Sequence, residues 1–94
     1  QLSAIVLAQA PAADRRYSVQ LGAYSSEAAA TEDLARLSRD HVDLLGDLKM
    51  RIEPPATGAQ TLWRLRAGPL TEEAARGICV NLKSRAADCV PTLE

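Results

Sequence analysis

Two stretches of the chain alternate apolar and polar residues, and each opens with an aromatic side chain. Residues 17–29 have the sequence YSVQLGAYSSEAA, and residues 63–75, which lie 46 positions later, have the sequence WRLRAGPLTEEAA. Alternation with a period of two is typical of a strand with one buried face. A hydroxyl residue followed by Glu and Ala is typical of a helix start, because the side-chain oxygen accepts a hydrogen bond from a free backbone N–H group. The chain therefore predicts a strand, a glycine turn and a capped helix twice.

The same patterns predict the remaining elements and their order, β-α-β-β-α-β. Strands are expected at residues 16–22, 48–53, 62–67 and 87–92, and helices at residues 26–39 and 72–84. Ser25 or Ser26 is expected to cap the first helix, and Thr71 the second. This order is typical of an α+β sandwich of the ferredoxin or RNP type, in which two helices cover one face of a four-stranded antiparallel sheet. We expect residues 16–94 to form this domain and residues 1–15 to be a linker or N-terminal arm.

The sheet face opposite the helices is the extended surface that this fold leaves free for a ligand. If the apolar positions of each strand face the helices, their neighbours face outward. The side chains expected on this open face are Ser18, Gln20, Gly22, Lys49, Arg51, Glu53, Leu62, Arg64, Arg66, Asp88, Val90 and Thr92. Their formal charge is +2, although the whole chain has a net charge of −1. Two interpretations stay open: these cations keep a bare sheet soluble, or guanidinium and carboxamide groups together bind a polar, anionic ligand.

Length and charge limit the kinds of protein to which this chain can belong. A chain of 94 residues is long enough for one domain with a modest core. Its net charge of −1 creates no general attraction to nucleic acid or to anionic membranes. The longest apolar run lies within residues 2–13 and is too short to be a transmembrane segment. The only methionine is Met50, which indicates a fragment or a processed product of a longer protein.

The two cysteines are ten positions apart. Cys79 is expected on the inner side of the second helix and Cys89 in the last strand, so they can face each other across a tight connection. Either they form a disulfide, which indicates an exported protein, or they are two buried thiols in a reducing compartment. A metal site is not expected, because one histidine and no Cys-x-x-Cys motif leave too few ligands.

Nothing in the sequence indicates catalysis or a cofactor. His41 is the only histidine and is expected to be solvated at the end of the first helix, so no nucleophile–His–acid set can be drawn around it. The chain has no glycine-rich phosphate loop. The acidic pairs at residues 32–33 and 72–73 fit helix surfaces and helix starts. We therefore expect a binding protein and not an enzyme.

Together, the two repeated stretches resemble the paired signature of SPOR (sporulation-related repeat) domains. The resemblance depends on VQLGAY at residues 19–24 and on an arginine four positions before the Gly-Pro of residues 68–69, and it covers residues 16–93. It implies the fold described above and a ligand, peptidoglycan glycan strands without stem peptides. It also implies a larger periplasmic or cell-envelope protein, exported or membrane-anchored, that acts at the division septum. The residues that match ligand-binding positions of the family are Gln20, Arg64 and Val90.

The chain departs from the family pattern at two positions. Leu62 stands where some members have an outward aromatic residue, and Ala23 stands where a small polar residue is common. Alternation sends Trp63 inward, so stacking of a sugar on an aromatic ring is not expected.

The expected glycan-binding site consists of six side chains on the open face: Ser18, Gln20, Leu62, Arg64, Arg66 and Val90. Arg64, helped by Arg66, is expected to pair with the lactyl carboxylate that a muramic acid exposes once its stem peptide is removed. Gln20 and Ser18 would bind N-acetyl and hydroxyl groups, while Leu62 and Val90 would contact sugar faces.

The sequence is also compatible with two functions other than glycan binding by the open face. The first alternative is a protein-interaction module of the envelope or division machinery, in which the open face or a strand edge binds a partner. The second is binding of single-stranded RNA. It is disfavoured because the expected outward face has no aromatic residue for base stacking.

Overall fold

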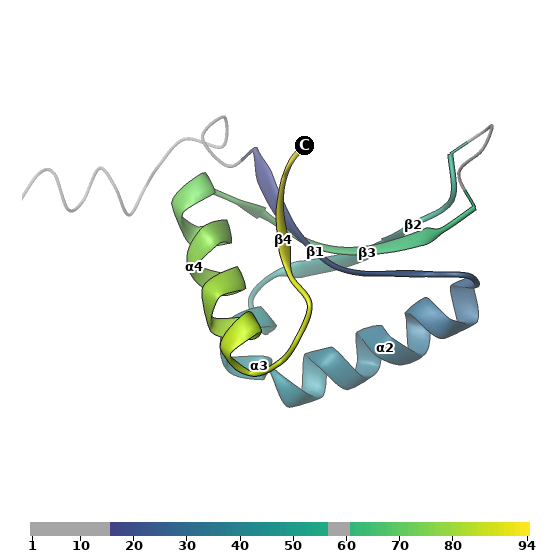
Figure 1. Ribbon diagram of the computed structural model, residues 1–94, viewed down its shortest axis with the longest axis horizontal. Coiled ribbons are helices and arrows are strands. Elements are labelled where there is room, and N and C mark those ends of the chain that lie inside the picture. The colour runs from purple at the N-terminus through teal and green to yellow at the C-terminus, as the bar shows by residue number, and fades with distance from the viewer. Residues whose placement is uncertain (1–15, 57–60) are drawn as a thin grey trace, which may run out of the picture.

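The computed structural model describes residues 16–56 and 61–94 as a four-stranded antiparallel sheet with helices against one face (Figure 1). The strands are β1 (Tyr17–Tyr24), β2 (Lys49–Glu53), β3 (Trp63–Leu70) and β4 (Val90–Leu93), and the helices are α2 (Glu27–Asp40), α3 (Val42–Leu45) and α4 (Glu72–Ser84). The strand order is β2-β3-β1-β4. The predicted α+β fold is confirmed. The prediction of a linker or arm at residues 1–15 concerns residues outside those that the structure describes.

Both long helices begin at a hydroxyl residue, as the sequence predicts. Ser26 Oγ accepts a hydrogen bond from the backbone N–H of Ala29 at 3.1 Å, and of the two candidate serines it is therefore the cap. Thr71 Oγ1 accepts from the backbone N–H of Ala74 at 3.2 Å. These bonds satisfy N–H groups that have no partner within the first turn. Among the described residues, no helix combines the length and the apolar composition needed to cross a bilayer.

Replacing Thr71 with alanine is expected to lower the free energy of unfolding by about 1 kcal/mol, because the N–H of Ala74 loses its acceptor. Urea unfolding of the two proteins measures this difference. Thr71→Ser keeps the oxygen and is the matched control. An equal loss of stability in Thr71→Ala and Thr71→Ser would contradict the capping role.

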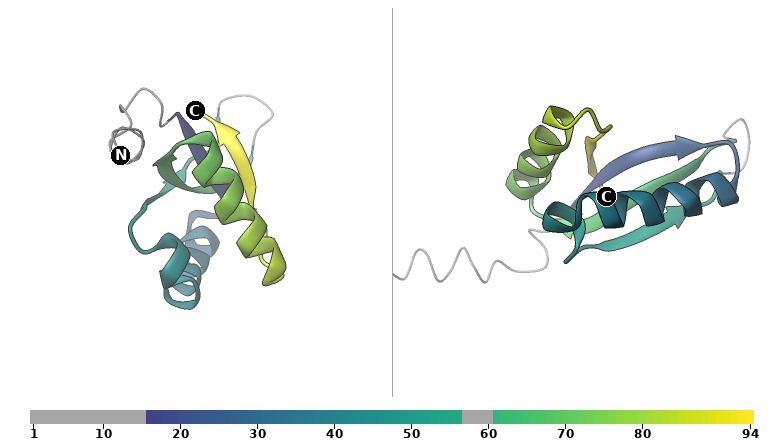
Figure 2. Two further views of the ribbon diagram at one scale, coloured as in Figure 1. Left: turned by 90° about the vertical axis from the view of Figure 1, so that its left-hand side faces the viewer. Right: turned by 90° about the horizontal axis from the view of Figure 1, so that it is seen from below.

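The core lies between the sheet and the helices and is built mainly of aliphatic side chains. The strands contribute Val19, Leu65 and Ala67, each with 0% of its surface exposed. Leu37 of α2 and Leu82 of α4 pack against them. Helix α2 lies against β1, β2 and β3, whereas α4 lies against β1 and β4 (Figure 2). No helix among residues 16–56 and 61–94 covers the opposite side of the sheet, which we call the open face.

A bulge in β1 changes which residues face outward. Gln20 pairs with Arg66. The next pair is Gly22 with Leu65, so two residues of β1 span one step of β3. Gly22 consequently shares the helix side with the buried Leu65, and a Cβ atom on this glycine would collide with a tyrosine ring. The expectation that Gly22 faces outward is wrong, and the exposed Ala23 takes that position instead.

Three strand ends also differ from the prediction by two residues or more. β1 continues through Gly22, where a turn is predicted, to Tyr24. β3 continues through Gly68 and Pro69 to Leu70, which pairs with Tyr17. β4 begins only at Val90, because the chain between α4 and Val90 forms a turn and a short connection. β4 is therefore short, and it pairs with only the first half of β1.

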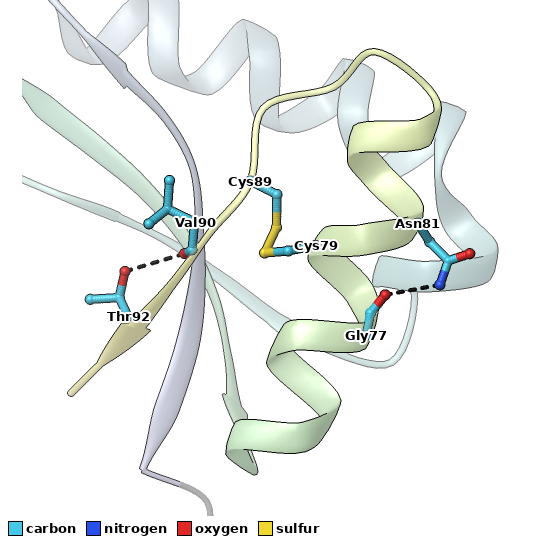
Figure 3. The surroundings of a disulfide bond; sticks show 6 residues. All are labelled: Gly77, Cys79, Asn81, Cys89, Val90 and Thr92. Carbon is cyan, nitrogen blue, oxygen red and sulfur yellow. Dashed lines mark hydrogen bonds between the residues drawn. A yellow bond between two sulfur atoms is a disulfide. The ribbon is translucent and has the colours of Figure 1, made fainter.

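A disulfide joins α4 to the residue before β4 (Figure 3). It links Cys79 to Cys89 with a Cα–Cα distance of 5.0 Å, and both residues are buried. Of the two states that the sequence leaves open for the cysteines, the disulfide is therefore the one present. It ties the short edge strand to the helix layer.

His41 is buried and not solvated, so that expectation is wrong. Only 9% of its surface is exposed, and its Nδ1 lies 3.3 Å from Nη1 of Arg85. α3 begins directly after His41, so the chain stays packed against the domain where a helix end in solvent was expected. Arg85, which follows α4, also forms an ion pair with Asp43 of α3, and its Nη2 donates to Oδ2 at 2.6 Å. This pair connects the end of α4 to α3.

Candidate ligand-binding face of the sheet

One row of side chains crosses all four strands on the open face. Arg51 of β2 lies opposite Arg66 of β3. Arg66 lies opposite Gln20 of β1, and Gln20 lies opposite Val90 of β4. Directly opposed residues of antiparallel strands share a face, so these four side chains lie side by side on the surface away from the helices. We call Arg51, Arg66, Gln20 and Val90 the central row.

Arg64 lies one pleat from the central row. It is opposite Glu53 of β2 and Ala23 of β1, which places it on the same face as Arg66. Leu62 precedes β3 and is 40% exposed, so it is available at the margin of this face. The structure thus brings together four of the six side chains expected in the site on one surface: Gln20, Arg64, Arg66 and Val90.

Ser18 belongs to the same face but is covered. It lies opposite Thr92, and none of its surface is exposed. Its Oγ donates a hydrogen bond to Oε2 of Glu94 at 2.9 Å. On the other side a Cβ atom at Gly68 would lie 3.2 Å from the Cβ of Ser18, so the glycine allows the two strands to approach closely. A ligand can therefore reach the Ser18 hydroxyl only when Glu94 moves away.

Glu94 joins the arginines into one charge network. Arg51 Nη2 donates to Glu94 Oε1 at 2.7 Å, and Arg51 Nε donates to Glu53 Oε2 at 2.9 Å. Arg66 Nη1 lies 3.2 Å from Glu53 Oε1 and 4.0 Å from Glu94 Oε2. Burial alone would raise the pKa of Glu94. Hydrogen bonds from Ser18 and Arg51 and the charges of both arginines outweigh burial and lower that pKa, so Glu94 is ionised at neutral pH.

A hollow of about 350 Å³ opens at the β4 end of the central row. Gln20 and Val90 line it together with Ala23, Lys83 and Asp88. It lies where β4 no longer pairs with β1. Asp88, expected to point outward from the last strand, precedes β4 and lines this hollow instead. A volume of this size suits a small organic group.

The sequence profile of the SPOR domain matches residues 13–92. The chain belongs to the SPOR domain family. Its structure is also similar to the solution structure of the peptidoglycan binding domain of the B. subtilis cell wall lytic enzyme CwlC, with a TM-score of 0.58 and 18% sequence identity over 83% of this chain and 87% of that chain. At this identity the likeness is one of fold. Among curated protein sequences, none matches the chain significantly.

All three aromatic residues of this SPOR domain lie in described strands, and their pairing places them on the helix side of the sheet. Trp63 pairs with Tyr24, and Tyr17 pairs with the buried Leu70. The register agrees with the prediction that Trp63 faces inward. Tyr24 donates a hydrogen bond to Asp33, and burial together with this bond raises the pKa of Tyr24 well above its ordinary value. A ligand on the open face must therefore be recognised by charged, polar and aliphatic groups.

Glu94 and Arg51 are absent from the site that the sequence predicts. The information that would find Glu94 lies in the same alternation, because Thr92 and Glu94 are successive outward positions once the strand is extended. The backbone N–H of Glu94 donates to the carbonyl oxygen of Arg16 at 2.7 Å, which continues the pairing past the end of β4. The pairing of Arg51 with Glu94 joins residues 43 positions apart, and alternation within single strands does not give such a contact.

Proposed function

We propose that this SPOR domain binds peptidoglycan through the open face and prefers glycan strands whose stem peptides have been removed. The observation that carries the proposal is the central row with Arg64 one pleat away, which places three guanidinium groups, a carboxamide and an exposed valine on one surface of the sheet. The fold shared with the peptidoglycan binding domain of CwlC supports it. The domain is a binding module, and we assign it no catalytic role.

A free carboxylate is the group that distinguishes a denuded glycan strand. In an intact strand the lactyl group of muramic acid is joined to the stem peptide through a neutral amide, and removal of the peptide leaves a carboxylate. Arg64, with Arg66 one pleat away, binds this carboxylate through charge-assisted hydrogen bonds that an amide cannot match. A stem peptide would also add bulk between the sugar chain and the sheet.

The remaining groups of the face bind the sugar rings. The Gln20 carboxamide can donate to and accept from an N-acetyl group, which has one donor and one acceptor of its own. The hollow beside Gln20 and Val90 takes the N-acetyl methyl group. Val90, which is 56% exposed, and Leu62 contact the apolar faces of the sugars.

The proposed ligand also assigns a compartment. Peptidoglycan lies outside the cytoplasmic membrane, in surroundings where a disulfide such as Cys79–Cys89 persists. We place the domain in the periplasm or cell envelope as part of a larger protein, which it targets to the division septum, where denuded strands are exposed.

Co-sedimentation with purified sacculi tests the proposal. Sacculi treated with an amidase, which removes stem peptides, are expected to retain the domain about tenfold more strongly than untreated sacculi, a difference of about 1.4 kcal/mol. Binding is expected to weaken between about 50 mM and 500 mM salt, because exposed charge pairs are screened. Equal retention by both kinds of sacculi would contradict the preference for denuded strands. Retention by an envelope protein without any binding to sacculi would favour the protein-interaction alternative.

A further inference from the structure

The carboxylate of Glu94 occupies a set of donors that comes from three strands. Ser18 of β1 donates its hydroxyl proton to Oε2 at 2.9 Å, and Arg51 of β2 donates from Nη2 to Oε1 at 2.7 Å. Nη1 of Arg66, on β3, lies 4.0 Å from Oε2. We call Ser18, Arg51 and Arg66 the Glu94 subsite. The subsite lies beside Arg64 and shares two arginines with the central row.

The surroundings of these donors are built for an anion. Ser18 is completely buried, so its hydroxyl group needs a partner that reaches it from above the sheet. Arg51 and Arg66 bring two positive charges to Glu94, and Glu53 pairs with both arginines on their other side. Nε of Arg66 is nevertheless buried and has no hydrogen-bond partner in the part of the chain that the structure describes. The single carboxylate of Glu94 lies within hydrogen-bond distance of Ser18 and Arg51, but it is 4.0 Å from Nη1 of Arg66.

We infer that the Glu94 subsite is a second carboxylate-binding position on the open face, and that Glu94 is an internal ligand which a carboxylate of a sugar acid displaces. The inference depends on the proposed function, because the carboxylate it calls for is the lactyl group of a denuded glycan strand. Ser18 and Arg51 thereby become ligand-binding residues once Glu94 has left. Arg64 then binds one part of the glycan, and the subsite binds another.

The position of Glu94 explains how the two carboxylates compete. The backbone of Glu94 is fixed by its hydrogen bond to Arg16, so its side chain remains next to the subsite at a constant effective concentration. A free ligand binds only to the fraction of molecules in which the subsite is open, and its apparent affinity is reduced by that fraction. Replacing Glu94 with glutamine keeps the shape but removes the charge, so the subsite opens more often.

The test is an NMR titration of the 94-residue chain with N-acetylmuramic acid, which carries the lactyl carboxylate, and with N-acetylglucosamine, which lacks it. Glu94→Gln is expected to raise the affinity for N-acetylmuramic acid by about 3- to 10-fold and to leave that for N-acetylglucosamine unchanged. Glu73→Gln removes the same charge from an exposed position on α4 and is the matched control. It is expected to behave as the unchanged protein. In the Glu94→Gln background, Arg51→Gln is expected to weaken binding of the sugar acid, because the ligand loses a charged donor where no charged competitor remains.

The outcomes separate this inference from the proposed function. If the unchanged protein sediments with denuded sacculi but Glu94→Gln and Glu73→Gln have equal affinities, the second subsite is wrong and glycan binding stands. Weaker binding by Glu94→Gln would show that Glu94 supports the site and would likewise overturn the inference. Unchanged affinity for the sugar acid when Arg51→Gln is added to Glu94→Gln would do the same. If neither the unchanged protein nor Glu94→Gln binds sacculi or the sugar acid, the proposed function and the subsite are both wrong.

Discussion

Replacing Arg64 with alanine is expected to weaken binding to amidase-treated sacculi by about 10- to 100-fold. Hydrogen bonds to a charged partner contribute about 1.5–3 kcal/mol, and the substitution removes such bonds to the ligand carboxylate. The thermal stability is expected to change little, because Arg64 is partly exposed on the open face and lies outside the core. Co-sedimentation over a range of protein concentrations measures the affinity, and thermal unfolding measures the stability.

Arg39→Ala is the control for the loss of one positive charge. Arg39 lies on α2, and 73% of its side chain is exposed. The Arg39→Ala protein should therefore bind sacculi as strongly as the unchanged protein does. If Arg64→Ala keeps its affinity, Arg64 is not part of the glycan site. If Arg39→Ala loses as much affinity as Arg64→Ala, general charge attraction holds the domain on sacculi.

Replacing both Cys79 and Cys89 with alanine is expected to lower the free energy of unfolding by roughly 2–3 kcal/mol. The bond closes a loop between positions ten apart, and the chain-entropy cost of closing such a loop is of that size. The effect is large for this domain because β4 is short and lies at the edge of the sheet, so the disulfide supplies much of what holds it in place. Guanidinium unfolding with and without reducing agent measures the difference.

The same substitution should also weaken glycan binding, because Val90 and the hollow follow directly after Cys89. Val80→Ala serves as the control, since Val80 is on the same helix and is 69% exposed. A loss of stability below about 0.5 kcal/mol, the range of ordinary surface substitutions, would show that the packing of β4 alone is sufficient.

The order of elements and the helix starts could be predicted because each depends on local patterns. The alternation around Val19 and Leu65 marks the buried face of the two central strands, and both residues are fully buried. Thr71 caps α4 as its sequence neighbours indicate. The facing cysteines follow from their spacing, since a helix and the next strand joined by a short turn bring their inner positions together.

Features that depend on distant side chains could not be predicted in the same way. Alternation assumes one residue per step, and the bulge at Gly22 breaks this assumption without a sign that distinguishes it from an ordinary glycine. The sequence places Ser18 on the correct face but does not reveal that Glu94 covers it. The charged sequence neighbours of His41 predict a solvated side chain, whereas its burial comes from the packing of α3 and of Arg85.

The register between β1 and β3 relates the two repeated stretches to each other in space. Tyr17 pairs with Leu70. In the repeat, Trp63 corresponds to Tyr17 and Tyr24 corresponds to Leu70, each 46 positions away. Trp63 and Tyr24 also pair with each other. The inner strands are therefore related by a pseudo-twofold axis that runs through the sheet.

Gln20 and Arg66 are counterparts of each other and form a pair, so the axis passes between them. A sugar polymer has a reducing and a non-reducing end, whereas a backbone with this symmetry offers nearly the same framework to a chain running in either direction. Under the proposed function, the direction of a bound glycan is therefore expected to depend on side chains, and first of all on the carboxamide on one side of the axis and the guanidinium on the other.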